Sequence, residues 1–286
     1  MTFGRRALLG GLGAAALVSR GARADDSPFV VSNFDFDDTG SFPKRALVLV
    51  PKSLPAGEKL PVAVLFHGRG AAKDGASAIR GWLDRWGLGE AHSRLSSPPI
   101  APGELLGTAR ATQLDDALAK KAYRGLVLVC PFTPDAYRLG LSRTFDELAT
   151  FTGGPLLSRV EREIAAADTS RLGIGGASLG GFAAIEVMAR IPARFAAAAV
   201  VQPALETSPP EHFATRMITG GTSGLRATVI TSRGDPFRKV SDALAAALAK
   251  KGIDATLRVS KGAHDAAFLR EVGSLEMTFA LERALG

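Results

Sequence analysis

The sequence GASLGG at residues 176–181 decides how this chain can fold. An apolar run at residues 171–175 precedes it, and a helical pattern at residues 182–190 follows it. A G-x-S-x-G sequence between a strand and a helix predicts a sharp turn that holds the serine hydroxyl clear of the sheet. Side chains at positions 176 and 180 would collide with neighbouring backbone, so glycine is needed there. We therefore predict that Ser178 is a nucleophile; the alternative is a tightly packed turn without chemistry.

Glycine-rich turns between a strand and a helix can also bind phosphate. The sequence at residues 176–181 lacks the Gly-Lys-Ser/Thr ending of a P-loop. A literal G-x-G-x-x-A sequence occurs at residues 11–16, but no strand pattern precedes it. The sequence therefore predicts no nucleotide site, and we expect no cofactor.

The first 24 residues have the features of a cleavable export signal. Arg5 and Arg6 are followed by an apolar run at residues 8–18 and by a small-x-small sequence, ARA, at residues 22–24. An apolar run of about 11 residues is too short to span a bilayer as a helix. The paired arginines resemble a twin-arginine signal, and the general secretory route is the alternative. Three nearby positions depart from the usual signal: Gly4, Leu8 and Gly10. We predict an exported protein, periplasmic or secreted.

Removal of residues 1–24 would take away four arginines and no acid, so the formal net charge would fall from +7 to +3. No run of basic residues interleaved with aromatics occurs, so the sequence does not indicate a nucleic-acid partner. No second apolar stretch approaches the length of a membrane span. The remaining chain, residues 25–286, is expected to form one α/β domain.

Cys130 is the only cysteine, so the chain cannot form an intrachain disulfide. It ends an apolar run at residues 125–129 and is predicted to be a small buried residue of a central strand. The four histidines of the sequence lack the spacing of metal ligands, so we expect no metal site.

Strand and helix patterns alternate along residues 25–286, which predicts a mostly parallel central sheet covered by helices on both faces. Expected strands are residues 45–50, 61–66, 125–130, 171–175, 196–201, 227–232 and 255–259, with residues 29–36 beside the first. Expected helices are residues 156–167, 182–190, 240–251 and 269–285. The segments between them are a helical insertion at 71–120, an irregular stretch at 131–155 and a short loop or lid at 203–226.

A serine hydroxyl needs a base and an orienting acid to act as a nucleophile at neutral pH. For a serine in this kind of turn, the partners follow in the order Asp or Glu, then His. His264 comes directly after the last expected strand and is the predicted base. The other histidine beyond Ser178, His212, lies in a Pro-rich segment. We predict that Asp265 caps the following helix.

Asp235 is the predicted acid because it directly follows the strand at residues 227–232. A Gly-Asp-Pro sequence is also a common structural turn, which is the alternative role for this residue. Glu206, beyond the strand at residues 196–201, is the second candidate for the acid. Asp242 would lie inside a helix and is a poor candidate.

The sequence HGRG at residues 67–70 follows an early buried strand. Attack by a serine on a carbonyl group needs two backbone N–H groups directed at the oxygen that gains charge. We predict the N–H of Leu179 as one, and that of Arg69 or Gly68 as the other. His67 is predicted to hold this loop by hydrogen bonds. The Arg69 side chain is expected to be solvated; the alternative is contact with an anionic part of a substrate.

Trp82 and Trp86 are four residues apart, so they would share one face of a helix near this loop. Packing against the core is the expected role. The alternative is a stacking surface for a sugar or an aromatic acyl group.

Taken together, HGRG at 67–70, GASLGGFAA at 176–184, GDP at 234–236 and GAHD at 262–265 resemble the motifs of α/β-hydrolases. The stretch at residues 168–181 resembles the esterase group that includes esterase D and the antigen 85-like proteins, with the small carboxylesterase/phospholipase group second. This resemblance implies a Ser178, Asp235 and His264 triad with backbone donors near Arg69 and Leu179. We expect hydrolysis of a small-molecule or polymer-linked carboxylic ester through an acyl-enzyme. An acyltransferase and a non-catalytic binding protein are the alternatives.

Overall fold

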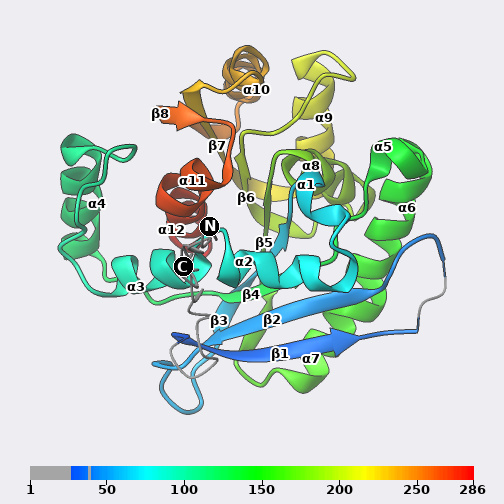
Figure 1. Cartoon of the computed structure of the whole chain (residues 1–286), viewed down its shortest axis with the longest axis horizontal. Coiled ribbons are helices and arrows are strands. Elements are labelled where there is room, and N and C mark those ends of the chain that lie inside the picture. The colour runs from blue at the N-terminus through cyan, green and yellow to red at the C-terminus, as the bar shows by residue number, and fades with distance from the viewer. Residues whose placement is uncertain (1–26, 38–39) are drawn as a thin grey trace, which may run out of the picture.

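An eight-stranded sheet organises residues 27–37 and 40–286, which the computed structural model describes (Figure 1). The strand order is β1-β2-β4-β3-β5-β6-β7-β8. The strands are Phe29–Asp35 (β1), Arg45–Pro51 (β2), Leu60–Phe66 (β3), Val127–Pro131 (β4), Ala167–Ala177 (β5), Phe195–Val201 (β6), Gly221–Gly234 (β7) and Asp254–Ala263 (β8). The predicted export signal lies outside the described residues.

The sheet is mixed but mostly parallel. Strand β2 pairs antiparallel with β1 and with β4, whereas the strands from β4 to β8 in the sheet order are parallel. The pairing of residues 29–36 beside the strand at 45–50 is confirmed. The apolar runs of β3 and β4 are buried along their whole length, as expected for strands covered on both faces.

Helices cover both faces of the sheet (Figure 1). Helix α12 contacts β5 and β6, and a Cβ on Gly175 of β5 would lie only 3.1 Å from the Met277 sulfur of α12. One layer of helices packs around α12. It contains α1 (Arg69–Ala72), η2 (Gly75–Arg80), α2 (Gly81–Asp84), α3 (Leu88–Ser96), α4 (Thr108–Lys120), α11 (Ala266–Phe268), η4 (Leu269–Gly273) and α12 (Ser274–Leu285). The other layer, around α8, contains α5 (Ala136–Leu139), α6 (Leu141–Phe151), η3 (Thr152–Leu156), α7 (Leu157–Glu163), α8 (Leu179–Arg190), α9 (Pro210–Gly220) and α10 (Arg238–Lys250). The predicted fold class is confirmed.

The segment at residues 131–155 is not irregular, as predicted, but mostly helical. Helix α6 buries Phe145, Leu148 and Phe151, whose spacing of three residues places them on one face. The ring of Phe145 packs against Phe182 of α8, with 4.9 Å between the centroids. The sequence Gly-Gly-Pro at residues 153–155 suggested a break, yet the chain continues through it as the π-helical turn η3.

The segment at residues 203–226 forms a helix and the start of a strand rather than the predicted loop or lid. Pro210 begins α9, a position where its missing N–H has no helical partner in any case. Phe213, Ala214 and Met217 are buried, and the helix packs against α8 and α10. Strand β7 then begins at Gly221, earlier than predicted.

Cys130 is fully buried in β4, as predicted, and burial raises the pKa of its thiol. Within the described residues, no helix combines the length and the apolar character needed to cross a membrane.

Candidate active site

Ser178 lies in a strained turn between the last residue of β5 and the first residue of α8. Its backbone has φ 56° and ψ −122°, a conformation that residues other than glycine rarely adopt. Backbone hydrogen bonds tie this turn to the end of β6: the Ser178 N–H donates to the Val201 carbonyl (2.9 Å), and the Ala204 N–H donates to the Ser178 carbonyl (3.1 Å). The strand-turn-helix context predicted for Ser178 is therefore present.

Gly176 and Gly180 let this turn lie against the end of β3. A Cβ on Gly180 would be 2.0 Å from the Phe66 carbonyl oxygen, and a Cβ on Gly176 would be 2.6 Å from the same atom. Carbon and oxygen atoms that are not bonded to each other do not come so close. A side chain at either position would therefore push the turn off the sheet. The predicted steric need for glycine is confirmed at both positions.

The structure brings Ser178, Asp235 and His264 together, although they lie on three different loops. His264 Nε2 is 2.9 Å from Ser178 Oγ, and His264 Nδ1 is 2.9 Å from Asp235 Oδ1. Asp235 follows β7 and His264 follows β8, and both strands run parallel to β5. The carboxyl ends of parallel strands meet at one edge of a sheet, which explains why these loops converge.

Asp235 is positioned to remain a carboxylate. Its side chain is fully buried, which alone raises its pKa, but three hydrogen bonds outweigh that effect and the pKa is lowered. The donors are His264 Nδ1, the Thr231 hydroxyl (2.7 Å) and the Phe237 N–H (3.1 Å). Because the carboxylate accepts from Nδ1, the proton of a neutral His264 sits on that nitrogen and Nε2 can accept the Ser178 proton.

The other candidates from the sequence lie apart from this cluster. Glu206 is exposed and makes no hydrogen bond to any described residue. His212 is exposed on α9, beside the ring of Phe213. Asp265 accepts a hydrogen bond from the Phe268 N–H (2.8 Å) and so caps α11, as predicted.

The loop at residues 67–70 lies beside the serine. A Cβ on Gly68 would be 3.5 Å from Ser178 Cβ, and Gly68, Arg69 and Ser178 line the same cavity. Arg69 begins α1 and Leu179 begins α8. The first N–H groups of a helix have no acceptor within the helix, and neither of these two donates to another described residue. Both N–H groups are therefore free to bind a substrate oxygen.

His67 fixes the shape of this loop, as predicted. Its Nε2 accepts from the Thr133 N–H (2.9 Å), so its Nδ1 carries the proton and donates to the Gly68 carbonyl (3.1 Å). Complete burial lowers the pKa of His67 to about 4, which keeps the ring neutral. Because C=O and N–H point in opposite directions across a trans peptide, holding the Gly68 carbonyl also sets the direction of the Arg69 N–H.

Gln202 is a residue of the site that the sequence did not suggest. It directly follows β6, has φ 44° and is buried. Its side-chain Nε2 donates to Ser232 Oγ and to the Ala263 carbonyl, both at 2.9 Å. Gln202 thus ties the ends of β7 and β8 together next to His264. A polar residue at the end of an apolar strand was the only hint in the sequence.

The cavity in front of Ser178 has a volume of about 390 Å³, within the range of small-molecule sites. Trp86 and Leu269 line its apolar side, and the cations Arg69, Lys73 and Arg85 lie at its rim. A neighbouring cavity of about 770 Å³ shares Arg69 and Lys73 with it and is otherwise lined largely by apolar side chains, including Phe42, Phe132 and Leu139.

The prediction that the two tryptophans share one face of a helix is wrong, because α2 ends at Asp84, before Trp86. Both side chains are buried in the hydrophobic core, as expected. Trp82 is fully buried and packs edge-on against Trp86, with 5.2 Å between the ring centroids, as expected for a core residue. Trp86 also borders the Ser178 cavity, so a stacking role is open to Trp86 alone.

The Arg69 side chain is 60% exposed and donates to Asp135 at 3.0 Å, which fits the predicted solvated residue. Within residues 27–37 and 40–286, no group of three or more His, Cys, Asp or Glu side chains is placed to hold a metal ion.

A strand-turn-helix serine with His and Asp partners on later loops of a mostly parallel sheet is the arrangement of the α/β-hydrolase fold, and the chain has this fold. The chain is similar to carboxyl esterase 2 from the mycorrhizal fungus Tuber melanosporum, with a TM-score of 0.62 and 14% identity over 94% of this chain and 90% of that one. A mutant feruloyl esterase module from Clostridium thermocellum, complexed with sinapinate, gives a TM-score of 0.62 and 14% identity over 89% and 88% of the two chains. A bacterial heroin esterase has a TM-score of 0.58 and 16% identity over 93% of this chain and 87% of that one.

No protein-family model matches the chain, and no curated protein matches its sequence. At 14–16% identity, the structural matches demonstrate the shared fold.

Proposed function

We propose that this protein is an exported serine ester hydrolase that acts through an acyl-enzyme, with Ser178, His264 and Asp235 as its triad. The observation that carries the proposal is the unbroken hydrogen-bond chain from Ser178 Oγ through His264 to Asp235, with the serine in a strained turn. The esterase names of the similar structures support a carboxylic ester as the substrate. Membership of the esterase D and antigen 85-like group is part of the proposal.

In the proposed reaction, His264 Nε2 accepts the Ser178 proton as Oγ attacks the ester carbonyl. The carbonyl oxygen gains charge and binds the N–H groups of Leu179 and of Arg69 or Gly68. His264 then gives the proton to the leaving alcohol, and the acyl group stays on Ser178. A water molecule, activated by the same histidine, attacks the acyl-enzyme and releases the acid. Asp235 stabilises the protonated ring throughout.

The cavities on either side of Arg69 and Lys73 suggest where the substrate lies. The cavity at Ser178 has room for the ester and one flanking group, and the larger neighbouring cavity offers an apolar surface for a bulkier part. We therefore propose an ester with a large group on one side, such as an aromatic acid or a polymer.

Labelling with a fluorophosphonate probe tests the chemistry. We expect one label per chain on Ser178, found by peptide mass spectrometry, and none in Ser178→Ala. Absence of label from the folded wild-type protein would favour a binding protein on the same fold. Product analysis with water and an alcohol in competition separates hydrolysis from acyl transfer, because both reactions share the acyl-enzyme.

Export is tested separately in a bacterial host. The mature N-terminus should begin after Ala24, and the double variant Arg5→Lys, Arg6→Lys should accumulate as unprocessed precursor inside the cell if the twin-arginine route is used. Efficient processing of that variant would indicate the general secretory route.

A further inference from the structure

A polar groove runs along the edge strand β8, on the side of the sheet that carries α12. Strands β7 and β8 pair so that Arg226 lies beside Asp254 and Thr228 lies beside Thr256. Side chains two residues apart in a strand share a face, so Arg258, next along β8, projects to the same side. These five residues form one wall of the groove.

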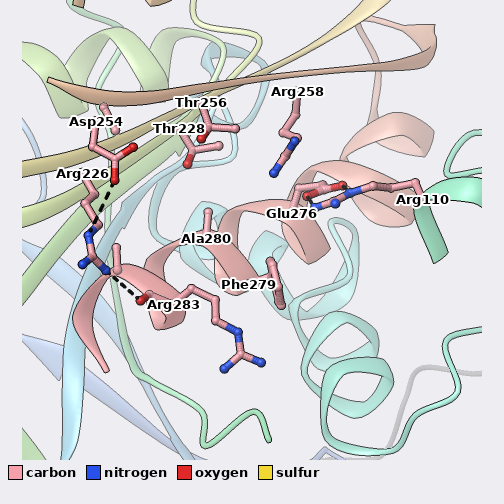
Figure 2. A pocket seen from close by; sticks show the side chains of 12 residues that line it. Arg110, Arg226, Thr228, Asp254, Thr256, Arg258, Glu276, Phe279, Ala280 and Arg283 are labelled. Carbon is pink, nitrogen blue, oxygen red and sulfur yellow. Dashed lines mark hydrogen bonds and ion pairs between the residues drawn. The ribbon is translucent and has the colours of Figure 1, made fainter. Parts of the chain in front are cut away.

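Helix α12 and Arg110 of α4 form the opposite wall (Figure 2). The groove has a volume of about 190 Å³. A second cavity of about 500 Å³ shares Arg110, Arg258 and Glu276 with it and extends along β8 to Arg233 and Lys261. None of the residues that line these two cavities lines the Ser178 cavity.

Most arginines of the smaller cavity have a carboxylate partner. Arg110 donates two hydrogen bonds to Glu276, at 2.6 and 2.7 Å, and Glu276 is almost fully buried. The other pairs are Arg226 with Asp254 (3.8 Å) and Arg283 with Glu282 (3.2 Å). The positive charges of these three side chains are therefore compensated.

Arg258 is the exception. It is half-buried, its side chain extends toward the Arg110–Glu276 pair (Figure 2), and it makes no hydrogen bond or ion pair with any described residue. Burial and the nearby charge of Arg110 lower the pKa of its guanidinium, the charge of Glu276 only partly offsets them, and the arginine stays charged. The hydroxyls of Thr228 and Thr256 likewise make no hydrogen bond within the described part of the chain. A half-buried cation thus lies in the same groove as two free hydroxyl groups.

We propose that this groove is a second binding site, specific for a phosphate or sulfate oxyanion, either free or carried by a larger molecule, with Arg258 as its anchor. A guanidinium presents several N–H donors to the oxygens of such an anion, and the two threonine hydroxyls can donate to the remaining oxygens. The adjoining cavity, with Arg233 and Lys261, gives room for the rest of a larger ligand. The proposal is independent of ester hydrolysis.

Isothermal titration of the purified protein tests this site, with inorganic phosphate and glucose 6-phosphate as separate ligands at constant ionic strength. We expect saturable binding that weakens at least about tenfold in Arg258→Gln, because charge-assisted hydrogen bonds are lost. Arg162→Gln is the matched control, since Arg162 is an exposed arginine of α7. That helix belongs to the layer around α8, on the face of the sheet opposite α12. Lys73→Gln removes a cation from the Ser178 cavity and should bind as the wild type does.

A double variant, Thr228→Val with Thr256→Val, should also weaken binding while it keeps every charge. Tighter binding of glucose 6-phosphate than of phosphate would identify a ligand that carries the anion as one of its groups, and equal binding would identify the free ion. The proposal fails if the wild type shows no saturable binding, if Arg258→Gln binds as well as the wild type, or if Lys73→Gln is the variant that loses binding.

Discussion

Strands β7 and β8 hold polar side chains in two contrasting ways. At their carboxyl ends, Asp235 accepts three hydrogen bonds, both ring nitrogens of His264 are engaged, and Gln202 donates twice. On the face that the same strands turn toward α12, Arg258 and two threonine hydroxyls have no hydrogen-bond partner within the described residues.

If both proposals hold, the contrast separates a reactive site at the strand ends from a binding site in the groove. Side chains with all their hydrogen bonds made have fixed positions, which is what a reaction needs from its catalytic groups. Side chains without protein partners have donors and acceptors that a ligand can bind in place of water. Substitutions at the strand ends should therefore change rates, whereas substitutions in the groove should change binding.

The largest effect is expected at the triad. Ser178→Ala and His264→Ala should each lower kcat for a nitrophenyl ester by on the order of 10⁴-fold or more. The double variant should be scarcely slower than either single variant, because the two residues act as one unit. Losses that multiply in the double variant would mean that the residues act independently, and the triad would have to be abandoned.

Asp235→Asn tests the acid and should lower kcat by roughly 10⁴-fold, because an amide cannot hold His264 in the required tautomer. Circular dichroism should show an unchanged fold. Glu206→Gln is the control and should retain near-normal kcat, since Glu206 has no contact with His264. The opposite pattern would move the acid to Glu206.

The sequence allowed the proposed triad to be located because each member comes shortly after a strand that the sequence predicts. Ser178, Asp235 and His264 stand at the ends of β5, β7 and β8, and parallel strands bring such positions together. Gly176 and Gly180 were identifiable from the G-x-S-x-G pattern, although the backbone that a side chain there would meet includes that of Phe66 in β3. The hydrogen-bond distances and the order of the strands in the sheet depend on packing between distant segments and could not be obtained this way.

What the sequence did not reveal depends on contacts between distant residues. Helix α6 is stabilised by Phe145 against Phe182 of α8, and such packing outweighs the breaker signal at residues 153–155. The role of Gln202 depends on the carbonyl of Ala263, 61 residues away. That Arg258 lacks a hydrogen-bond or ion-pair partner among the described residues is a property of the fold, because nothing in a sequence shows which charges will be paired.

The buried histidine of the loop beside Ser178 should make stability depend on pH. His67 has a pKa of about 4 in the fold and an ordinary value of 6.5 when unfolded. As the pH falls from about 6.5 toward 4, the unfolded chain binds a proton that the fold does not. The free energy of unfolding should therefore fall, by roughly 3 kcal/mol from this residue.

Urea denaturation at pH 7.5, 5.5 and 4 measures this dependence. The buried His92 contributes in the same direction, because its pKa is also lowered to about 4. His67→Gln should flatten the dependence, whereas replacement of the exposed His212 by Gln should leave it unchanged. An equally steep dependence in His67→Gln would show that His67 is not kept neutral by the fold.

Gln202→Met tests whether the tie between the strand ends positions His264. Methionine has a similar size but no donors, so the Ala263 carbonyl would lose a hydrogen bond. We expect kcat to fall roughly tenfold with little change in KM, because a small misplacement of a catalytic group slows the reaction. Loss of stability with an unchanged kcat would assign Gln202 a purely structural role.

The smallest effect is expected for the folding stability of Arg258→Gln without phosphate or sulfate. In that buffer Arg258 makes no hydrogen bond or ion pair with a described residue, so its removal breaks none and relieves a half-buried charge. The free energy of unfolding, measured with urea, should stay within about 0.5 kcal/mol of the wild type or rise slightly. In buffer that contains phosphate, the wild type should become more stable and the variant should not, since a ligand stabilises only the form that binds it. A marked loss of stability in the anion-free buffer would show that Arg258 supports the fold itself, and the contrast between the strand ends and the groove would then disappear.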